Sequence, residues 1–194
     1  MFRDGFFRLL KIIGTPYLRI KHKINVNGKF NIPTQNGFII ASNHINNDDQ
    51  FIIAKVLTGK TFSGLASTTI KKTFRGRLFS LLGVVYVDRN NPDDRKRAKQ
   101  ELEEKLLNGE NCLVFPEGTR KIKHPEYNNE PLMPLKYGVV SMSQKTGASI
   151  LPIGLKYEGR VVTVNIGGIF SVLPEEDLTE ANNRLRDRLI DLLK

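Results

Sequence analysis

The most informative stretch of the chain reads Gly37-Phe38-Ile39-Ile40-Ala41-Ser42-Asn43-His44-Ile45-Asn46-Asn47-Asp48-Asp49. Its apolar run, 38–41, is typical of a short strand that ends at a polar turn. Positions 48–57 follow with helical spacing of apolar side chains, and the aspartate pair suits a helix N-terminus, where backbone N–H groups are unpaired. A strand that passes through a polar turn into a helix is a building unit of α/β folds.

The same alternation continues along the chain. The spacing of apolar residues predicts strands at 63–67, 84–87, 112–115, 149–155 and 161–166, and helices at 74–82, 91–108, 135–145 and from 178 onward. No repeat or long linker divides these segments. We therefore expect an α/β fold, in the form of a single-domain αβ sandwich with a mixed sheet flanked by helices and an N-terminal amphipathic helix.

The first 23 residues combine apolar side chains at steps of three and four with six bases and one acid. A basic amphipathic helix of this kind tends to lie in a membrane interface, although an ordinary helix that covers the core has the same spacing. Both interpretations hold if one side of the helix packs on the domain and the other side contacts lipid. Gly14-Thr15-Pro16 should break or kink this helix. We predict a membrane-interface helix region over 1–26 and a separate domain over 27–194.

The charge balance narrows the class of partner. Thirty Lys and Arg against 20 Asp and Glu give a net charge of +10, which points to nucleic acid, an anionic membrane or a phosphorylated substrate. We predict no nucleic-acid partner, because Trp is absent and most aromatic residues sit in apolar runs. The single cysteine, Cys112, excludes an intramolecular disulfide and favours a reducing compartment. Neither a membrane-spanning stretch nor the apolar core of a signal peptide is expected.

His44 and the aspartates that follow it are candidates for acid–base chemistry. Histidine takes up a proton near neutral pH, and a carboxylate on its other ring nitrogen fixes the tautomer and stabilises the imidazolium. By itself the spacing also fits a surface turn in which Asp48 or Asp49 caps the next helix.

Two downstream segments add polar residues at the ends of predicted strands. Asp88-Arg89 follows the strand at 84–87, and Glu117-Gly118-Thr119-Arg120 follows the strand at 112–115. Ligands of α/β folds bind outside the carboxyl ends of the strands, so these groups can converge with His44. Arginine binds phosphate through two parallel hydrogen bonds, Gly118 allows close backbone approach, and Thr119 can add a hydroxyl donor. Glu117 would instead orient an arginine or a substrate hydroxyl.

Taken together, these segments resemble the motifs of the glycerolipid (lysophosphatidic acid) acyltransferase family. The family pattern Asn-His-x-x-x-x-Asp is similar to Asn43, His44 and Asp49, and Phe-Pro-Glu-Gly-Thr-Arg is similar to 115–120. The pattern Gly-x-x-(aromatic)-x-(Asp)-Arg is similar to 83–89, and a fourth, apolar motif is similar to 150–153. Asn46 and Lys121 depart from residues that are frequent in the family. The family spacing favours Asp49 over Asp48 as the partner of His44.

The resemblance implies transfer of a fatty acyl group from a thioester to the 2-hydroxyl of 1-acylglycerol 3-phosphate. In such an enzyme His44 would be the general base, Asp49 would hold it, and Arg89 and Arg120 would bind the acceptor phosphate with Gly118 and Thr119. No metal and no cofactor are implied beyond acyl-coenzyme A or acyl-carrier protein as co-substrate. We expect a peripheral protein on the cytoplasmic face of the cell membrane, bound to its anionic surface. The alternatives are another acceptor (glycerol 3-phosphate or another lysolipid) and an inactive membrane-surface protein.

Overall fold

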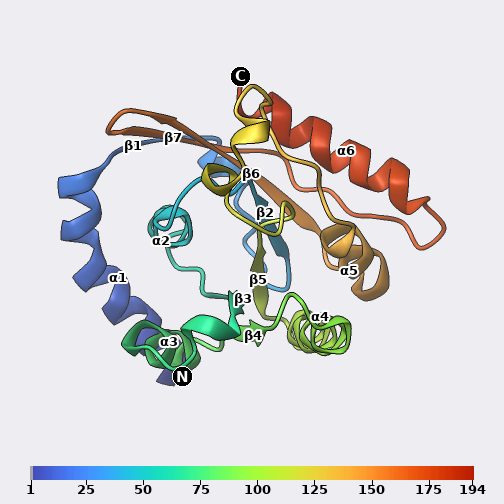
Figure 1. The fold of residues 1–194 in the computed structure, drawn as a ribbon, viewed down its shortest axis with the longest axis horizontal. Helices are drawn as coiled ribbons and strands as arrows, with labels where there is room; N and C mark the ends of the chain where they lie inside the picture. The colour runs from blue at the N-terminus through green and yellow to red at the C-terminus, as the bar shows by residue number, and fades with distance from the viewer. Residues whose placement is uncertain (1) are drawn as a thin grey trace.

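One mixed sheet forms the centre of the molecule (Figure 1). The computed structural model describes the backbone of residues 2–194, and all side chains in it except those of 2–4, 6, 8–13, 74, 75 and 78. In this part of the chain seven strands pair in the order β1-β7-β6-β2-β5-β3-β4, and only β6 and β7 are antiparallel to each other. The strands are β1 (Lys23–Asn27), β2 (Ile39–Ser42), β3 (Phe62–Ser67), β4 (Val85–Val87), β5 (Asn111–Val114), β6 (Ile150–Glu158) and β7 (Val161–Ile166).

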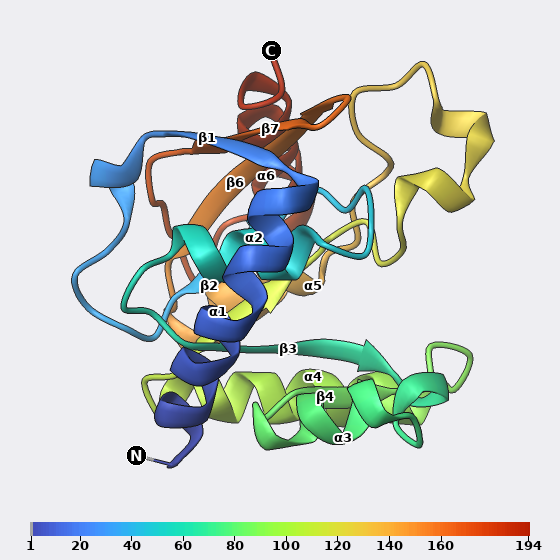
Figure 2. The same ribbon diagram turned by 90° about the vertical axis from the view of Figure 1, so that its left-hand side faces the viewer.

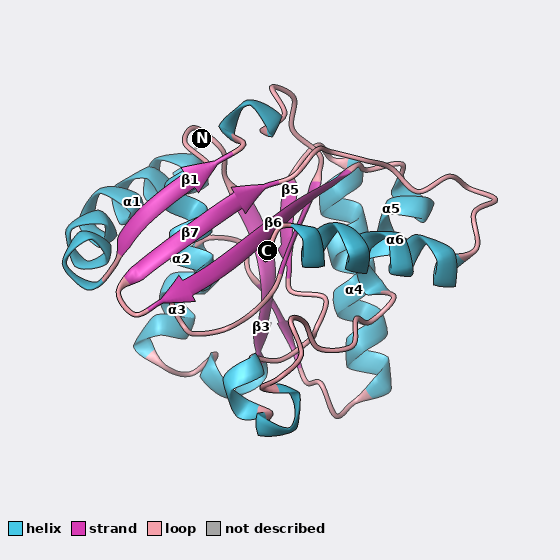
Figure 3. Cartoon of the chain, turned by 90° about the horizontal axis from the view of Figure 1, so that it is seen from above, coloured by secondary structure: helices cyan, strands magenta, loops and turns pink. Residues whose placement is uncertain are grey.

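Helices cover both faces of this sheet. They are α1 (Phe2–Lys21), α2 (Asp49–Val56), α3 (Phe74–Leu81), α4 (Pro92–Leu107), α5 (Gly138–Thr146) and α6 (Leu178–Asp191). Figure 1 shows α1 and α2 on one side of the sheet and α4, α5 and α6 on the other. Seen from above, α1 lies beside the edge strand β1, and α6 packs on β6 (Figure 3). The predicted α/β sandwich is confirmed.

The alternating direction of side chains along each strand produces two cores. Ile39 and Ala41 of β2 point into the core under α4, α5 and α6, whereas Ile40 points into the core under α1 and α2. On β5, Val114 and Leu113 divide in the same way. Both central strands are therefore buried on both faces, which explains why they read as continuous apolar runs in the sequence.

The structure differs from the sequence-based expectation at the N-terminal end. Pro16 does not break the helix, because α1 is continuous from Phe2 to Lys21 and packs on the core at Phe7 and Leu18, on both sides of the proline. The following strand, β1, was not expected, since exposed polar residues alternate along it and it pairs only at the edge with β7. The strand β1 spans the boundary predicted between the helix region 1–26 and the domain 27–194. That boundary stays a prediction. The helix α5 also begins later than expected, at Gly138.

Two sides of α1 face different surroundings. Figure 2 shows the helix in front of α2, running from the level of α3 up to β1. Phe7 and Leu18 are buried, whereas Tyr17 and Ile20 are 54% and 74% exposed. The sequence predicts an apolar face at positions 2, 6, 7, 9, 10, 12, 13, 17 and 20. Of these, 2, 6, 9, 10, 12 and 13 lie outside the described side chains. No helix in the described part of the chain has the length and apolar character needed to cross a membrane.

The end of α1 is tied to the start of α2 through Asp48. Its Oδ2 atom lies 2.6 Å from the Lys21 ammonium and 2.9 Å from the Nε2 atom of His22. Burial alone would raise the pKa of Asp48, but the hydrogen bonds from Lys21 and His22 outweigh it and hold this pKa below its ordinary value. The ionised carboxylate therefore stabilises the junction of α1, β1 and α2.

We expect Asp48→Asn to lower the free energy of unfolding by about 1–3 kcal/mol at neutral pH, because buried charge-assisted hydrogen bonds are lost. A carboxyl group with a depressed folded-state pKa stabilises the fold above its unfolded pKa and loses this effect as the pH falls through the folded value. The difference between wild type and variant should therefore shrink as the pH falls below the ordinary carboxyl pKa of about 3.9 and on through the lower folded-state pKa of Asp48. Denaturant titrations across pH measure it. Asp191→Asn, which breaks an exposed pair with Lys194, is the matched control and should change little.

Candidate active site

Three loops meet at one edge of the sheet. The strands β2, β5, β3 and β4 are parallel neighbours, so the loops that follow them leave the sheet at the same edge. Ala41 of β2 pairs with Val114 of β5, which brings the loop of His44 beside the loop that begins at Phe115. The segments predicted from sequence to carry chemistry are thereby collected on this edge.

The backbone of His44 is fixed from several directions. The side chain of the preceding residue, Asn43, exchanges two hydrogen bonds with the backbone of Leu155 in β6, at 2.9 and 2.8 Å. The His44 N–H donates to Oε1 of Glu117 at 2.7 Å, and its carbonyl accepts from the Lys121 N–H at 2.8 Å. The imidazole stacks on Phe115, with ring centroids 3.9 Å apart. This histidine is held in one orientation before any ligand arrives.

His44 and Asp49 form a hydrogen-bonded pair. The Nδ1 atom of His44 lies 2.7 Å from Oδ2 of Asp49, whose side chain has no exposed surface, while that of His44 is 15% exposed. The backbone N–H groups of Ile45 and Asn46 also donate to Oδ2. A carboxylate acceptor places the imidazole proton on Nδ1 and leaves the Nε2 lone pair for a substrate. Asp48 faces Lys21 and His22 instead, so the pairing predicted for Asp49 is the one that forms.

Tyr157 on β6 completes the surroundings of Asp49, and it is absent from the site residues predicted from sequence. Its hydroxyl donates to Oδ1 of Asp49 at 2.5 Å. Burial and the Asp49 charge raise the pKa of Tyr157, which keeps the phenol protonated and able to donate. No short-range pattern pointed to this residue, because it lies 108 positions from Asp49 in the sequence.

The two predicted arginines lie close enough to interact. Arg89 follows β4 and is exposed, and Arg120 follows β5 and donates to the side-chain oxygen of Asn47. Desolvation by the surrounding protein, together with the positive charge of Arg120, lowers the pKa of Arg89. Two guanidinium groups at one edge, without an acid bonded to either among the described contacts, form a surface that suits an anion.

Gly118 turns the loop between these groups with a φ of +74°, and its N–H donates to the Phe115 carbonyl at 2.9 Å. A Cβ atom at this position would lie 2.7 Å from Nζ of Lys136. The positive φ therefore favours glycine, and a larger residue would also displace the flexible end of Lys136. Lys136 is exposed and brings a further cation beside Gly118, although the sequence motifs gave it no role. Thr119 is half-buried in the same turn.

Glu117 connects the loop of His44 to the segment around Met133 through its carboxylate. Besides the His44 N–H, it accepts the Met133 N–H on Oε2 at 3.1 Å, and the residue is 5% exposed. Burial raises the pKa of Glu117, although the two backbone donors favour its ionised form. Its described hydrogen bonds go to main-chain groups rather than to an arginine, so its predicted contact with substrate stays a prediction.

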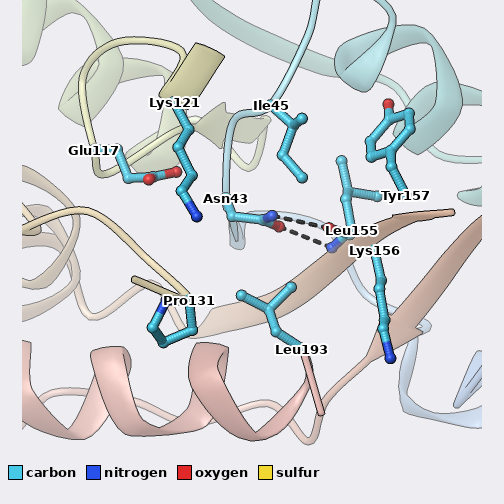
Figure 4. Close-up of a pocket in the computed structure, with 9 residues that line it drawn as sticks. All are labelled: Asn43, Ile45, Glu117, Lys121, Pro131, Leu155, Lys156, Tyr157 and Leu193. Carbon is cyan, nitrogen blue, oxygen red and sulfur yellow. Dashed lines mark hydrogen bonds between the residues drawn. The ribbon is translucent and has the colours of Figure 1, made fainter. Parts of the chain in front are cut away.

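A cavity of about 230 Å³ lies beside the histidine loop (Figure 4). It is lined by Asn43, Ile45, Glu117, Lys121, Pro131, Leu155, Lys156, Tyr157 and Leu193. The lining combines apolar side chains with the ammonium of Lys121, which points inward. Among the described residues no cluster of His, Cys, Asp or Glu has the geometry of a metal site.

A histidine–carboxylate pair beside clustered cations, at the carboxyl edge of an α/β sheet, defines a class of enzyme that can activate a hydroxyl group near an anion. The sequence model of the family described as Acyltransferase matches residues 23–156. The chain therefore belongs to the acyltransferase family, which confirms the resemblance found in the motifs.

Curated relatives support the same family. The chain is 28% identical to 1-acyl-sn-glycerol-3-phosphate acyltransferase LPAT1 of Arabidopsis thaliana, over 77% of this chain and 40% of the relative. It is 29% identical to the 1-acyl-sn-glycerol-3-phosphate acyltransferase of Borreliella burgdorferi, over 69% and 51%, and 26% identical to the human alpha enzyme, over 74% and 50%. The chain thus spans about half the length of the curated relatives it matches.

A solved structure shares the fold. The 1-acyl-sn-glycerophosphate (LPA) acyltransferase PlsC of Thermotoga maritima superposes with a TM-score of 0.76 at 21% identity, over 96% of this chain and 78% of that one.

We expect Gly118→Ala to lower the free energy of unfolding by about 1–2 kcal/mol, because an L side chain is strained at positive φ. Gly109→Ala is the matched control, since Gly109 has a φ of +76° and open space where a Cβ atom would lie. The Gly118 variant should lose at least as much stability as the control, because Lys136 must also move. Denaturant unfolding of both variants measures the difference, and a smaller loss at Gly118 would contradict the close approach.

Proposed function

We propose that this chain transfers a fatty acyl group from an acyl thioester to the 2-hydroxyl of 1-acylglycerol 3-phosphate, forming phosphatidic acid. The observation that carries the proposal is the His44–Asp49 pair, 2.7 Å apart, at the edge of the sheet that also holds Arg89 and Arg120. The names of the curated relatives support the acceptor, since each is called a 1-acyl-sn-glycerol-3-phosphate acyltransferase.

The proposed reaction has a single tetrahedral intermediate. Nε2 of His44 accepts the proton of the acceptor hydroxyl while its oxygen attacks the thioester carbonyl carbon. The intermediate collapses, the carbon–sulfur bond breaks, and the protonated imidazole returns the proton to the thiolate. Asp49 stabilises the imidazolium between these two steps. The acyl group passes directly to the acceptor, with no covalent acyl-enzyme.

The acceptor phosphate is proposed to lie on the cations that follow β4 and β5. Arg89 and Arg120 would bind its oxygens, with Gly118 and Thr119 supplying the turn that leads to Arg120. Glu117, whose carboxylate holds the His44 N–H, would also orient the substrate hydroxyl. The substrate hydroxyl, which belongs to the same molecule as the phosphate, would then reach Nε2 of His44.

The protein is proposed to work on an anionic membrane, at its cytoplasmic face, because the acceptor is a lipid. The exposed Tyr17 and Ile20, with the basic residues of α1, support contact with such a surface. The acyl donor would be acyl-coenzyme A or acyl-carrier protein. Both are polyanions, and the net charge of +10 suits either one.

Another acceptor, glycerol 3-phosphate or a different lysolipid, would use the same dyad and the same cations. An inactive membrane-surface protein is the less favoured alternative, because it would not need the buried Asp49 beneath His44.

The decisive assay supplies the purified chain with 1-acylglycerol 3-phosphate and either acyl-coenzyme A or acyl-carrier protein, and measures the phosphatidic acid formed. We expect turnover that falls by ~10²–10⁴-fold in His44→Ala, because the general base is lost. His124→Ala, which removes a partly exposed histidine bonded to Glu126, is the control and should keep activity. Monoacylglycerol, which lacks the phosphate, should be a poor acceptor. Full activity of the His44 variant would refute the general-base role.

Membrane binding can be tested without removing α1, whose Phe7 and Leu18 are part of the core. Arg19→Gln combined with Ile20→Ser removes one exposed charge and one exposed apolar side chain from the helix. We expect several-fold weaker co-sedimentation with vesicles that contain anionic phospholipid, since each cation near such a surface contributes about 1 kcal/mol. Leu107→Ser, on the end of α4 and 67% exposed, is the control. Equal binding of all three proteins would exclude Arg19 and Ile20 as contacts with the membrane.

A further inference from the structure

The two oxygen atoms of the Asp49 carboxylate accept different numbers of hydrogen bonds. Oδ2 accepts from the His44 ring and from the backbone N–H groups of Ile45 and Asn46. Oδ1 accepts from the Tyr157 hydroxyl at 2.5 Å, its one donor among the described contacts. Asp49 has no exposed surface, so solvent does not share this bond in the folded protein.

The hydroxyl of Tyr157 is oriented by its own surroundings. The side chain rises from β6 beside Leu155, and Figure 4 shows its hydroxyl directed away from Lys121 and Leu193 in the cavity. The rings of Tyr157 and His22 meet in an edge-to-face arrangement, with centroids 5.9 Å apart. Two segments distant in sequence, β6 and the end of α1, therefore hold the donor in place.

We propose that Tyr157 is a positioning residue of the dyad, whose hydroxyl fixes the Oδ1 side of Asp49 and thereby holds His44 ready to accept a proton. The proposal rests on the proposed function, in which His44 is the general base. Tyr157 itself does not touch the reacting atoms. It acts through Asp49, from the side of the carboxylate opposite the imidazole.

The direction in which loss of the Tyr157 hydroxyl should shift the titration of the His44–Asp49 pair follows from the charge of the pair. The dyad is ready for catalysis when Asp49 is ionised and His44 is neutral, a state with net negative charge. A donated hydrogen bond favours that state over the protonated one. Its loss should therefore raise the apparent pKa at which the pair takes up a proton, whichever member holds it.

Other charged groups around the pair are unchanged by removing one hydroxyl. They are Glu117 on the β5 loop with Lys121 beside it, Asp48 at the start of α2, and Lys21 and His22 at the end of α1. A shift of the titration in a variant without the hydroxyl therefore reports the bond to Asp49.

The test is Tyr157→Phe in the full chain, with steady-state acyl transfer measured across pH. We expect kcat to fall by about tenfold, less than the ~10²–10⁴-fold loss from removing the base itself. The KM for 1-acylglycerol 3-phosphate should change by less than about twofold, because Tyr157 is not at the phosphate site. The acid limb of the kcat profile should move to higher pH. An unchanged profile with unchanged kcat would overturn the proposal.

Tyr86→Phe is the matched control. The Tyr86 hydroxyl is also buried but donates to the Gly76 carbonyl, so its loss should lower thermal stability without moving the pH profile. An equal shift of the profile in both variants would assign the effect to general loosening and overturn the proposal.

A second measurement separates this inference from the proposed reaction. Titration of the His44 ring by NMR in wild type and Tyr157→Phe needs no substrate, and we expect a higher apparent pKa in the variant. If wild type transfers no acyl group but this shift is present, the positioning role stands and the proposed reaction fails. If acyl transfer is present without the shift, the positioning role fails.

Discussion

The carboxylate of Asp49 lies where water cannot reach it, and the surrounding loops supply the hydrogen bonds that water would have made. An unpaired buried charge is costly, so the chain must bring donors to both of its oxygens. The turn at Ile45 and Asn46 gives two backbone N–H groups, and the imidazole of His44 gives a third donor. Tyr157 gives the fourth, from β6. Satisfying this one group orders the loop after β2, orients the histidine and connects both to the centre of the sheet.

The motifs could be placed correctly from sequence because the strands before them are central and parallel. A strand buried on both faces reads as an apolar run, and the first polar residue after it marks the carboxyl edge of the sheet. His44 could therefore be placed after β2, and Glu117 after β5, before any pairing was known. Pairing of Ala41 with Val114 then makes the two loops neighbours, which sequence order alone does not state.

Contacts between segments far apart in the chain could not be predicted from the apolar pattern and the motifs. The side chain of Asn43 binds the backbone of Leu155, and its motif position gives no hint of that partner. Tyr157 reaches Asp49 only because β6 lies next to β2. The edge strand β1 was missed for a different reason, since exposed lysine and asparagine side chains alternate along it and mask its β character.

The proposed membrane helix and the dyad are parts of one connected structure. Phe7 and Leu18 bury one side of α1 in the core beneath the sheet, so the helix does not hang from the domain as a separate module. At its end, Lys21 and His22 bind Asp48, the immediate neighbour of Asp49. A tilt of α1 relative to the sheet would have to break the hydrogen bonds to Asp48 or expose apolar surface. The exposed side of α1 is therefore held at a fixed position relative to His44, and a membrane that bound the helix, as proposed, would also set the direction in which this edge of the sheet faces.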